Sequence, residues 1–261
     1  MRNLNIIHIF FCYLPLDIFN VKMYIVCKNE VKKLSKIIAI GGGNIAEGDT
    51  LAIDEYIVQS ANKNNPKLLF LPTACEDNLD YINNVKIVFE DLGCQVNSLC
   101  LVSTMLSNKK IEEEIFSSDI IYVGGGDTAV MLKTWETYGI DKMLKAAYKK
   151  GIILSGLSAG AICWFKGGYS NPNEDDSHTL PNVFIEGLGL IPYIVCPHYE
   201  NDYCKRFDIE IEDMPYPGLA LESSTAIVFD GKKIESIRSN FKRNVYLVMN
   251  NQKTKTKIRD L

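Results

Sequence analysis

The stretch that decides the fold runs from Gly151 to Ala161 and reads GIILSGLSAGA. Its apolar, β-branched run at residues 152–155 predicts a buried strand, because the run is short and a glycine bounds it on each side. Gly-x-Ser-x-Gly between a strand and a helix is the pattern of a nucleophile elbow, a tight turn that exposes a reactive hydroxyl. Gly156 and Gly160 lack side chains, so strand and helix can approach closely. The stretch therefore predicts Ser158 as a nucleophile at the carboxyl end of a buried strand.

Outward from this stretch, short apolar runs alternate with amphipathic stretches. The runs expected to form buried strands are residues 36–40, 68–71, 95–101, 120–123 and 152–155. The stretches expected to form helices, with apolar residues three and four positions apart, are residues 51–62, 81–92, 129–135, 140–149 and 159–165. Strands that alternate with helices indicate parallel pairing through right-handed crossovers. The expected fold is α/β, with a doubly wound, mostly parallel sheet flanked by helices on both faces.

The pattern changes after the nucleophile elbow. A polar stretch at residues 167–182 predicts a loop, and Asp230-Gly231 predicts a C-terminal antiparallel hairpin between residues 226–229 and 234–237. The remaining expected elements are strands at residues 191–196 and 218–221, an edge strand at 244–249 and a charged tail at 251–261. One domain is therefore expected over residues 36–250.

Composition excludes several classes of protein. The chain has 261 residues, of which 47% are hydrophobic and 23% charged, as in an ordinary globular domain. The formal net charge of −4 gives no basic surface for phosphates, so we expect no nucleic-acid partner and favour a small molecule. The eight cysteines include no C-x-x-C pair, and Cys196, His198 and Cys204 are too loosely spaced for zinc. We therefore expect reduced thiols, no metal and a cytoplasmic protein.

The N-terminus carries an apolar run at residues 6–16. His8 and Pro15 interrupt this run, no small-residue cleavage site follows it, and it is too short to span a bilayer. We therefore expect no membrane partner. We expect residues 1–35 to lie outside the domain, as a genuine extension, a weak secretion signal or residues upstream of a start at Met23.

Two further glycine turns follow predicted strands. The turn at residues 124–126 could offer backbone N–H groups to an oxyanion, or it could be only a tight connection before a helix capped by Asp127. The turn at residues 41–43 resembles a dinucleotide-binding loop, but the second strand ends without the acidic residue that binds a ribose. We therefore expect no cofactor there, and interpret residues 41–43 as a structural or substrate-side loop.

A serine nucleophile needs a base, and the sequence contains only three histidines. His8 lies in the extension and His178 in a polar loop, whereas His198 ends a predicted strand and is the favoured base. A carboxylate should then orient the imidazole. Glu222 ends another predicted strand and is favoured, while Glu200 and Asp202 remain open as rivals close to His198.

Together these motifs resemble the peptidase E, or aspartyl dipeptidase, family of serine peptidases, to which cyanophycinase is related. The resemblance covers about residues 36–250. It rests on residues 39–43, 122–128, 156–161, 187–190, 197–199 and 219–222, which read AIGGG, YVGGGDT, GLSAGA, GLGL, PHY and LALE. It implies a class I glutamine amidotransferase-like fold and a Ser, His and Glu triad in that chain order.

Matched motif by motif, the resemblance assigns the triad to Ser158, His198 and Glu222. It places Gly125, or a neighbouring glycine of the same turn, in the oxyanion hole. The elbow itself offers the other donor, the N–H of Ala159 at the start of the next helix. Cysteine occupies the elbow in the amidotransferase relatives, so Ser158 argues against glutamine-derived ammonia chemistry.

The substrate is less defined than the nucleophile. The best-known members need a cation to hold an aspartate side chain, and the candidates for substrate binding here are Gly126, Asp127 and Arg206. The acidic stretch at residues 171–182 could instead recognise an amine. The expected activity is hydrolysis of short peptides, dipeptides among them, through an acyl-enzyme. A hydrolase of modified or β-linked amides and a non-catalytic binding protein stay open as alternatives, as does a homodimer.

Overall fold

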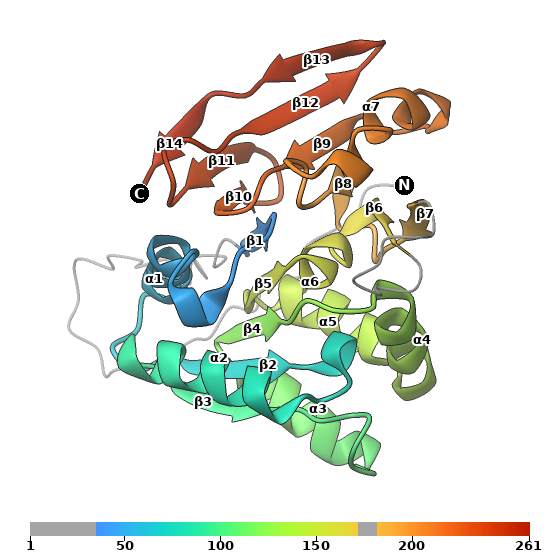
Figure 1. Cartoon of the computed structure of the whole chain (residues 1–261). Coiled ribbons are helices and arrows are strands. Elements are labelled where there is room, and N and C mark those ends of the chain that lie inside the picture. Colours follow the sequence, from blue (N-terminus) through green and yellow to red (C-terminus); the bar gives the residue numbers. More distant parts are fainter. Residues whose placement is uncertain (1–34, 172–181) are drawn as a thin grey trace, which may run out of the picture. The chain divides into compact units, whose positions relative to one another are not determined.

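The computed structural model describes residues 35–171 and 182–261 (Figure 1). The larger sheet has eight strands in the order β14-β11-β10-β1-β5-β4-β2-β3. These strands are β1 (Ile37–Ile40), β2 (Lys67–Leu71), β3 (Gln95–Ser98), β4 (Ile120–Val123), β5 (Ile153–Leu157), β10 (Thr225–Phe229), β11 (Ile234–Arg238) and β14 (Ile258–Asp260). Strands β1 to β5 pair in parallel, as the alternating pattern predicts. The mixed α/β fold expected from the sequence is confirmed.

Helices cover both faces of this sheet (Figure 1). They are α1 (Leu51–Ser60), α2 (Leu79–Asp91), α3 (Asn108–Ser117), α4 (Thr128–Tyr138) and α5 (Ile140–Lys149). Successive strand residues point to opposite faces, so Ile38 and Phe70 pack with α1 and α2, while Ile37 and Leu69 pack with α3, α4 and α5. Helix α3 was not expected from the sequence, because only Ile111 and Ile115 are buried on its otherwise mostly charged surface.

The strands that precede His198 and Glu222 belong to a second sheet, which has six strands. Its order is β13-β12-β9-β8-β6-β7. Its strands are β6 (Phe165–Ser170), β7 (Val183–Glu186), β8 (Ile191–Cys196), β9 (Gly218–Leu221), β12 (Val245–Met249) and β13 (Gln252–Lys255). The shorter helical elements are α6 (Ala159–Ile162), α7 (Phe207–Glu210), η1 (Ile45–Glu47), η2 (Thr73–Cys75), η3 (Asp202–Cys204) and η4 (Ile211–Asp213).

Several expectations for the chain after Ser158 were wrong. The expected loop at 167–182 begins as strand β6, where a Cβ on Gly168 would lie 2.6 Å from the Ile162 side chain. The helix after Ser158 ends at Ile162 rather than Phe165, because the chain turns directly into β6. Strand β12 is not an edge strand, since β13 pairs along its outer side. The expected charged tail at 251–261 instead forms β13 and β14, so the folded domain continues past residue 250.

The expected hairpin is confirmed. Strands β10 and β11 pair antiparallel around Asp230 and Gly231, and Gly231 has φ +91°. The Asp230 carboxylate accepts hydrogen bonds from the N–H groups of Lys232 and Lys233. Among residues 35–171 and 182–261, no helix has the length and apolar character to cross a membrane. The expected N-terminal extension, residues 1–35, lies outside the described residues except for Ser35.

Candidate active site

The turn at Ser158 has the geometry of a nucleophile elbow. Ser158 has φ 57° and ψ −115°, a left-handed backbone conformation that is uncommon for a residue with a side chain. A Cβ on Gly156 would lie 2.2 Å from the Gly160 carbonyl oxygen, and one on Gly160 would lie 2.2 Å from that of Val123. Both glycines are therefore sterically required, as the sequence motif predicts.

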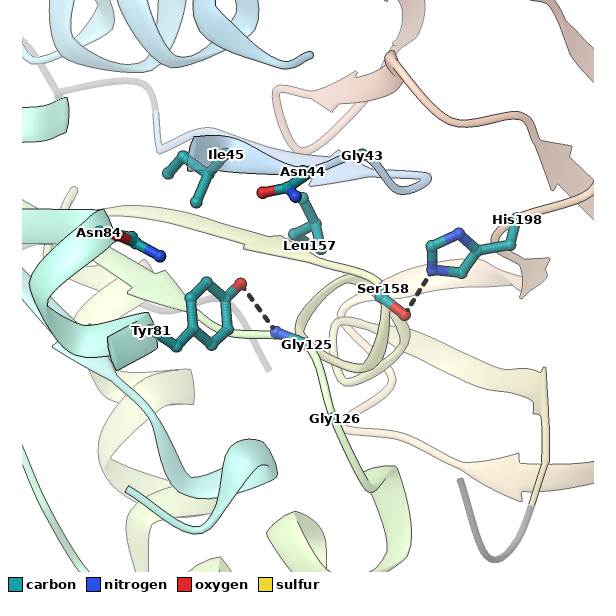
Figure 2. Close-up of a pocket in the computed structure, with 10 residues that line it drawn as sticks. All are labelled: Gly43, Asn44, Ile45, Tyr81, Asn84, Gly125, Gly126, Leu157, Ser158 and His198. Atoms are coloured by element: carbon teal, nitrogen blue, oxygen red, sulfur yellow. Dashed lines mark hydrogen bonds between the residues drawn. The ribbon is translucent and has the colours of Figure 1, made fainter. Parts of the chain in front are cut away.

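The His198 side chain points toward Ser158, and both residues line one pocket (Figure 2). Its Nε2 lies 2.9 Å from the Ser158 Oγ, which is hydrogen-bonding distance. The predicted nucleophile and the predicted base therefore meet, although 40 positions separate them in the chain. The rival histidines, His8 and His178, lie outside the described residues.

The end of β1 holds both of these residues. The Ile40 carbonyl accepts a hydrogen bond from the Ser158 N–H at 3.1 Å, and the Gly41 carbonyl accepts one from the His198 N–H at 2.9 Å. A Cβ on Gly42 would lie 2.4 Å from the Nδ1 and Cε1 atoms of His198. Gly42 thus leaves room for the imidazole, a role that could not be identified from the sequence.

The third member of the predicted triad has other contacts. The Glu222 carboxylate accepts hydrogen bonds from the Asn244 N–H at 2.8 Å and from the Tyr246 hydroxyl at 3.4 Å. The Nδ1 of His198 lies 3.4 Å from the hydroxyl of Ser223, the residue after Glu222. A triad role for Glu222 stays a prediction from sequence.

The rival carboxylate, Glu200, contacts the same serine. Its Oε2 accepts a hydrogen bond from the Ser223 N–H at 3.0 Å, and its Oε1 lies 3.6 Å from Arg243 Nη1. Burial would raise the pKa of Glu200, but hydrogen bonds from the Ser223 hydroxyl and from backbone N–H groups, together with Arg243, hold it below its ordinary value. Glu200 therefore carries a negative charge at neutral pH.

A pocket of about 330 Å³ opens beside the Ser158 hydroxyl (Figure 2). Its lining residues are Gly43, Asn44, Ile45, Tyr81, Asn84, Gly125, Gly126, Leu157, Ser158 and His198. This volume lies at the small end of the range for ligand pockets, about 300 to 1,000 Å³. The pocket therefore matches a small ligand in size.

Two backbone N–H groups lie beside the nucleophile. Ala159 begins α6, so its N–H has no acceptor within that helix. The N–H of Gly125 donates to the Tyr81 hydroxyl at 3.3 Å, and a Cβ on Gly125 would lie 3.4 Å from the Ser158 Cβ. Burial raises the pKa of Tyr81 to about 12, so this phenol stays protonated at neutral pH. Tyr81 was not identified from the sequence, where its only signal was a position near the start of an expected helix.

The predicted substrate-binding residues lie apart. Gly126 lines the pocket, whereas Asp127 caps α4 by accepting a hydrogen bond from the Val130 N–H at 2.9 Å. Arg206 forms an ion pair of 2.7 Å with Glu210, its side chain is 71% exposed, and it is not among the residues that line the pocket. Within the described part of the chain, the six cysteines are free thiols and no cluster of three or more metal-binding side chains occurs.

Known proteins resemble this chain in both sequence and fold. The sequence model of peptidase family S51 matches residues 37–237. An uncharacterized peptidase, YgaJ, from Bacillus subtilis is 35% identical over 174 residues, which cover 66% of this chain and 72% of that protein. A probable alpha-aspartyl dipeptidase from Drosophila melanogaster is 27% identical over 69% of this chain and 75% of its own.

A solved structure agrees with the fold. The crystal structure of a putative peptidase E protein from Listeria monocytogenes superposes with a TM-score of 0.62 at 22% sequence identity, covering 79% of this chain and 99% of that one. The family match spans β1 to β11 and includes Ser158 and His198. The chain is therefore a member of peptidase family S51.

Proposed function

We propose that this peptidase is a serine hydrolase that cleaves short peptides through an acyl-enzyme on Ser158. The observation that carries the proposal is the 2.9 Å distance between His198 Nε2 and the hydroxyl of Ser158, which is held in a strained backbone conformation. A base within hydrogen-bonding distance is what converts a weakly nucleophilic alcohol into a nucleophile.

The proposed reaction has two steps. In the first, Ser158 Oγ bonds to the scissile carbonyl carbon while its proton moves to His198 Nε2, and His198 then protonates the departing amine as the C–N bond breaks. In the second, water attacks the ester, gives a proton to His198, and displaces Ser158, which regains its proton. The N–H groups of Gly125 and Ala159 are the proposed donors to the oxyanion in both steps.

The proposal includes a glutamate behind the imidazole. A carboxylate that orients a histidine stabilises the imidazolium formed when the serine proton moves. The family pattern assigns this role to Glu222, and Glu200 remains its rival. Variants of both residues separate these assignments.

Short substrates are favoured by the size of the pocket. A volume of about 330 Å³ accommodates a few residues rather than a long chain. The relative from Drosophila is named as a probable alpha-aspartyl dipeptidase, which supports dipeptides as the first substrates to test. A panel of free dipeptides with different N-terminal residues, with β-linked and modified amides beside them, defines the substrate class.

Ser158→Ala tests the proposal. We expect this variant to lose at least about 10³-fold in kcat on the best substrate of the panel and to lose labelling by a fluorophosphonate probe. Its melting temperature should stay close to that of the wild type, because the alanine keeps the same Cβ in the same turn.

Ser155→Ala is the matched control. The Ser155 hydroxyl is buried and donates to the Ile38 carbonyl at 2.9 Å, so its loss should destabilise the fold by about 1 kcal/mol and spare turnover. Wild-type levels of hydrolysis by Ser158→Ala would refute the proposal.

A further inference from the structure

We propose that Glu200 and the Ser223 hydroxyl form a positioning pair that orients His198, with the carboxylate acting on the imidazole through the serine. This inference rests on the proposed base role of His198. The carboxylate that orients the imidazole is then Glu200, two residues after His198, rather than Glu222.

The contacts form one continuous chain. The imidazole reaches Ser158 through Nε2 at 2.9 Å and Ser223 through Nδ1 at 3.4 Å. Ser223 in turn donates to Glu200 from its N–H at 3.0 Å, and its hydroxyl is one of the groups that lower the pKa of Glu200. The contacts therefore run from the Ser158 hydroxyl through the imidazole to Ser223 and then to the Glu200 carboxylate. In this order the base lies between the nucleophile and the group that orients the base.

Backbone contacts hold the members of this chain together. The Tyr199 N–H donates to the Leu221 carbonyl at 3.0 Å, and the Ser224 N–H donates to the Gly42 carbonyl at 2.9 Å. A Cβ on Gly42 would lie 2.7 Å from the Ser223 Oγ. The segments carrying Glu200 and Ser223 are thus fixed against each other on either side of His198.

The proton count then selects one tautomer of His198. A serine hydroxyl has one proton to donate and two lone pairs to accept with. Because an ionised Glu200 can only accept, the Ser223 hydroxyl donates its hydrogen bond to Glu200 and presents a lone pair to Nδ1. The proton of the neutral imidazole is therefore held on Nδ1, and Nε2 presents its lone pair to the hydroxyl of Ser158.

Glu200 also forms an ion pair with Arg243, and the two charges differ in their exposure to solvent. Glu200 Oε1 lies 3.6 Å from Arg243 Nη1, and the side chains are 20% and 36% exposed. The carboxylate is therefore the more buried of the two charges, and the less screened. The Glu222 carboxylate is directed to Asn244 and Tyr246 on the β12 side.

The test uses the titration of His198, which can be followed by NMR without any substrate. The sequence contains three histidines, so the His198 ring signal is assigned by its loss in His198→Gln. We expect Glu200→Gln to move the His198 midpoint to lower pH, because the amide keeps the hydrogen-bond acceptor and loses the charge. Arg243→Gln should move it to higher pH. These opposite directions are not expected if Glu200 and Arg243 are merely structural.

Kinetics give the second measurement. Glu200→Gln and Ser223→Ala should each lower kcat by about 10- to 100-fold with KM changed less than about threefold, since the effect falls on proton transfer rather than on binding. The acidic limb of kcat/KM should shift with the NMR midpoint in Glu200→Gln.

Two glutamates serve as comparisons. Glu222→Gln should leave the His198 midpoint in place and lower the melting temperature, because it weakens the contact with the Asn244 N–H. Glu136→Gln, on the exposed side of α4, controls for the loss of one negative charge. A midpoint that moves in Glu222→Gln and stays in Glu200→Gln would overturn the inference. Because the NMR titration needs no turnover, that result is distinct from a failure of the proposed peptidase reaction.

Discussion

The two halves of the site are built in different ways. The Ser158 half is one continuous stretch, in which β5, the turn and α6 follow one another within residues 153–162. The His198 half is assembled from three separate segments, at residues 41–43, 197–200 and 221–224. A continuous half can be predicted from a motif, because its geometry depends on neighbours in sequence. The assembled half depends on contacts that no single segment specifies.

The glycines show this difference directly. Gly156 and Gly160 are required because they touch backbone atoms of the turn and of neighbouring β4. Gly42 is required because a histidine more than 150 positions away packs against it. Substitutions at these glycines should therefore fail for different reasons.

The largest effect is expected for Gly156→Ala. The new Cβ would lie 2.2 Å from a backbone oxygen of Gly160, which cannot move without opening the junction of β5 and α6. We expect a loss of about 4 kcal/mol in the free energy of unfolding, or no folded protein at all. Chemical denaturation measures it, and a variant with wild-type stability would show that the turn is not sterically fixed.

A smaller effect, on turnover rather than on folding, is expected for Gly42→Ala. Its Cβ would lie 2.4 Å from the imidazole, which would have to move away from Ser158. We expect kcat to fall about 100-fold, with loss of fluorophosphonate labelling.

Gly48→Ala is the control for Gly42→Ala. Gly48 also has positive φ, at 77°, but a Cβ there has no neighbour within 4 Å. This variant should lose about 1 kcal/mol of stability through backbone strain alone and keep its activity. Equal kinetic losses in the two variants would remove the distinction between the halves of the site.

The last effect is on stability alone and concerns Asp54, a buried acid on α1. Burial raises the pKa of Asp54 to about 7, although the Thr50 hydroxyl donates to it at 2.7 Å. The folded protein therefore keeps this proton over a range, from about pH 4 to 7, in which the unfolded chain releases it, so stability falls as the pH rises through that range.

Asp54→Asn should remove this dependence. We expect the variant to be more stable than the wild type by about 4 kcal/mol at pH 8, since each unit of raised pKa corresponds to about 1.4 kcal/mol, and nearly equal to it at pH 4. Thermal unfolding across this range measures the difference. If the difference in stability between the two proteins did not change with pH, the pKa of Asp54 would be close to its ordinary value in the folded protein. The buried face of α1 would then accommodate an ionised carboxylate.

Most of the parallel part of the fold was predictable, because β1, β2, β4 and β5 are compact apolar runs bounded by turns. The expected strand at 95–101 was too long, since β3 ends at Ser98. Strand β6 was missed because Gly167 and Gly168, which let it pack closely, suggest a loop. Strand β13 was missed because all four of its residues are exposed and polar, so only its pairing with β12 identifies it. Helix α3 has too few apolar residues to show a period.

Two of the predicted site residues, Ser158 and His198, each follow a strand, and their side chains lie within hydrogen-bonding distance. The carboxylate was harder to assign, because successive residues beyond a strand direct their side chains to different sides. The side chain of Glu222 reaches Asn244, while that of Ser223 reaches His198. Tyr81 and Gly42 could not be identified from the sequence, because no motif marks them. Their roles follow from contacts with Gly125 and His198, which are distant in the chain.

The consecutive carbonyl groups at the end of β1 have a dynamic consequence. Ile40 and Gly41 bind the backbone of Ser158 and His198, and adjacent residues of one chain are a fixed 3.8 Å apart. Small motions of one sheet against the other would therefore displace the Ser158 hydroxyl and the His198 imidazole together. The distance between Ser158 and His198 is therefore governed by the covalent spacing of Ile40 and Gly41. We expect the proposed catalysis to tolerate fluctuations that would separate two residues held by unconnected segments.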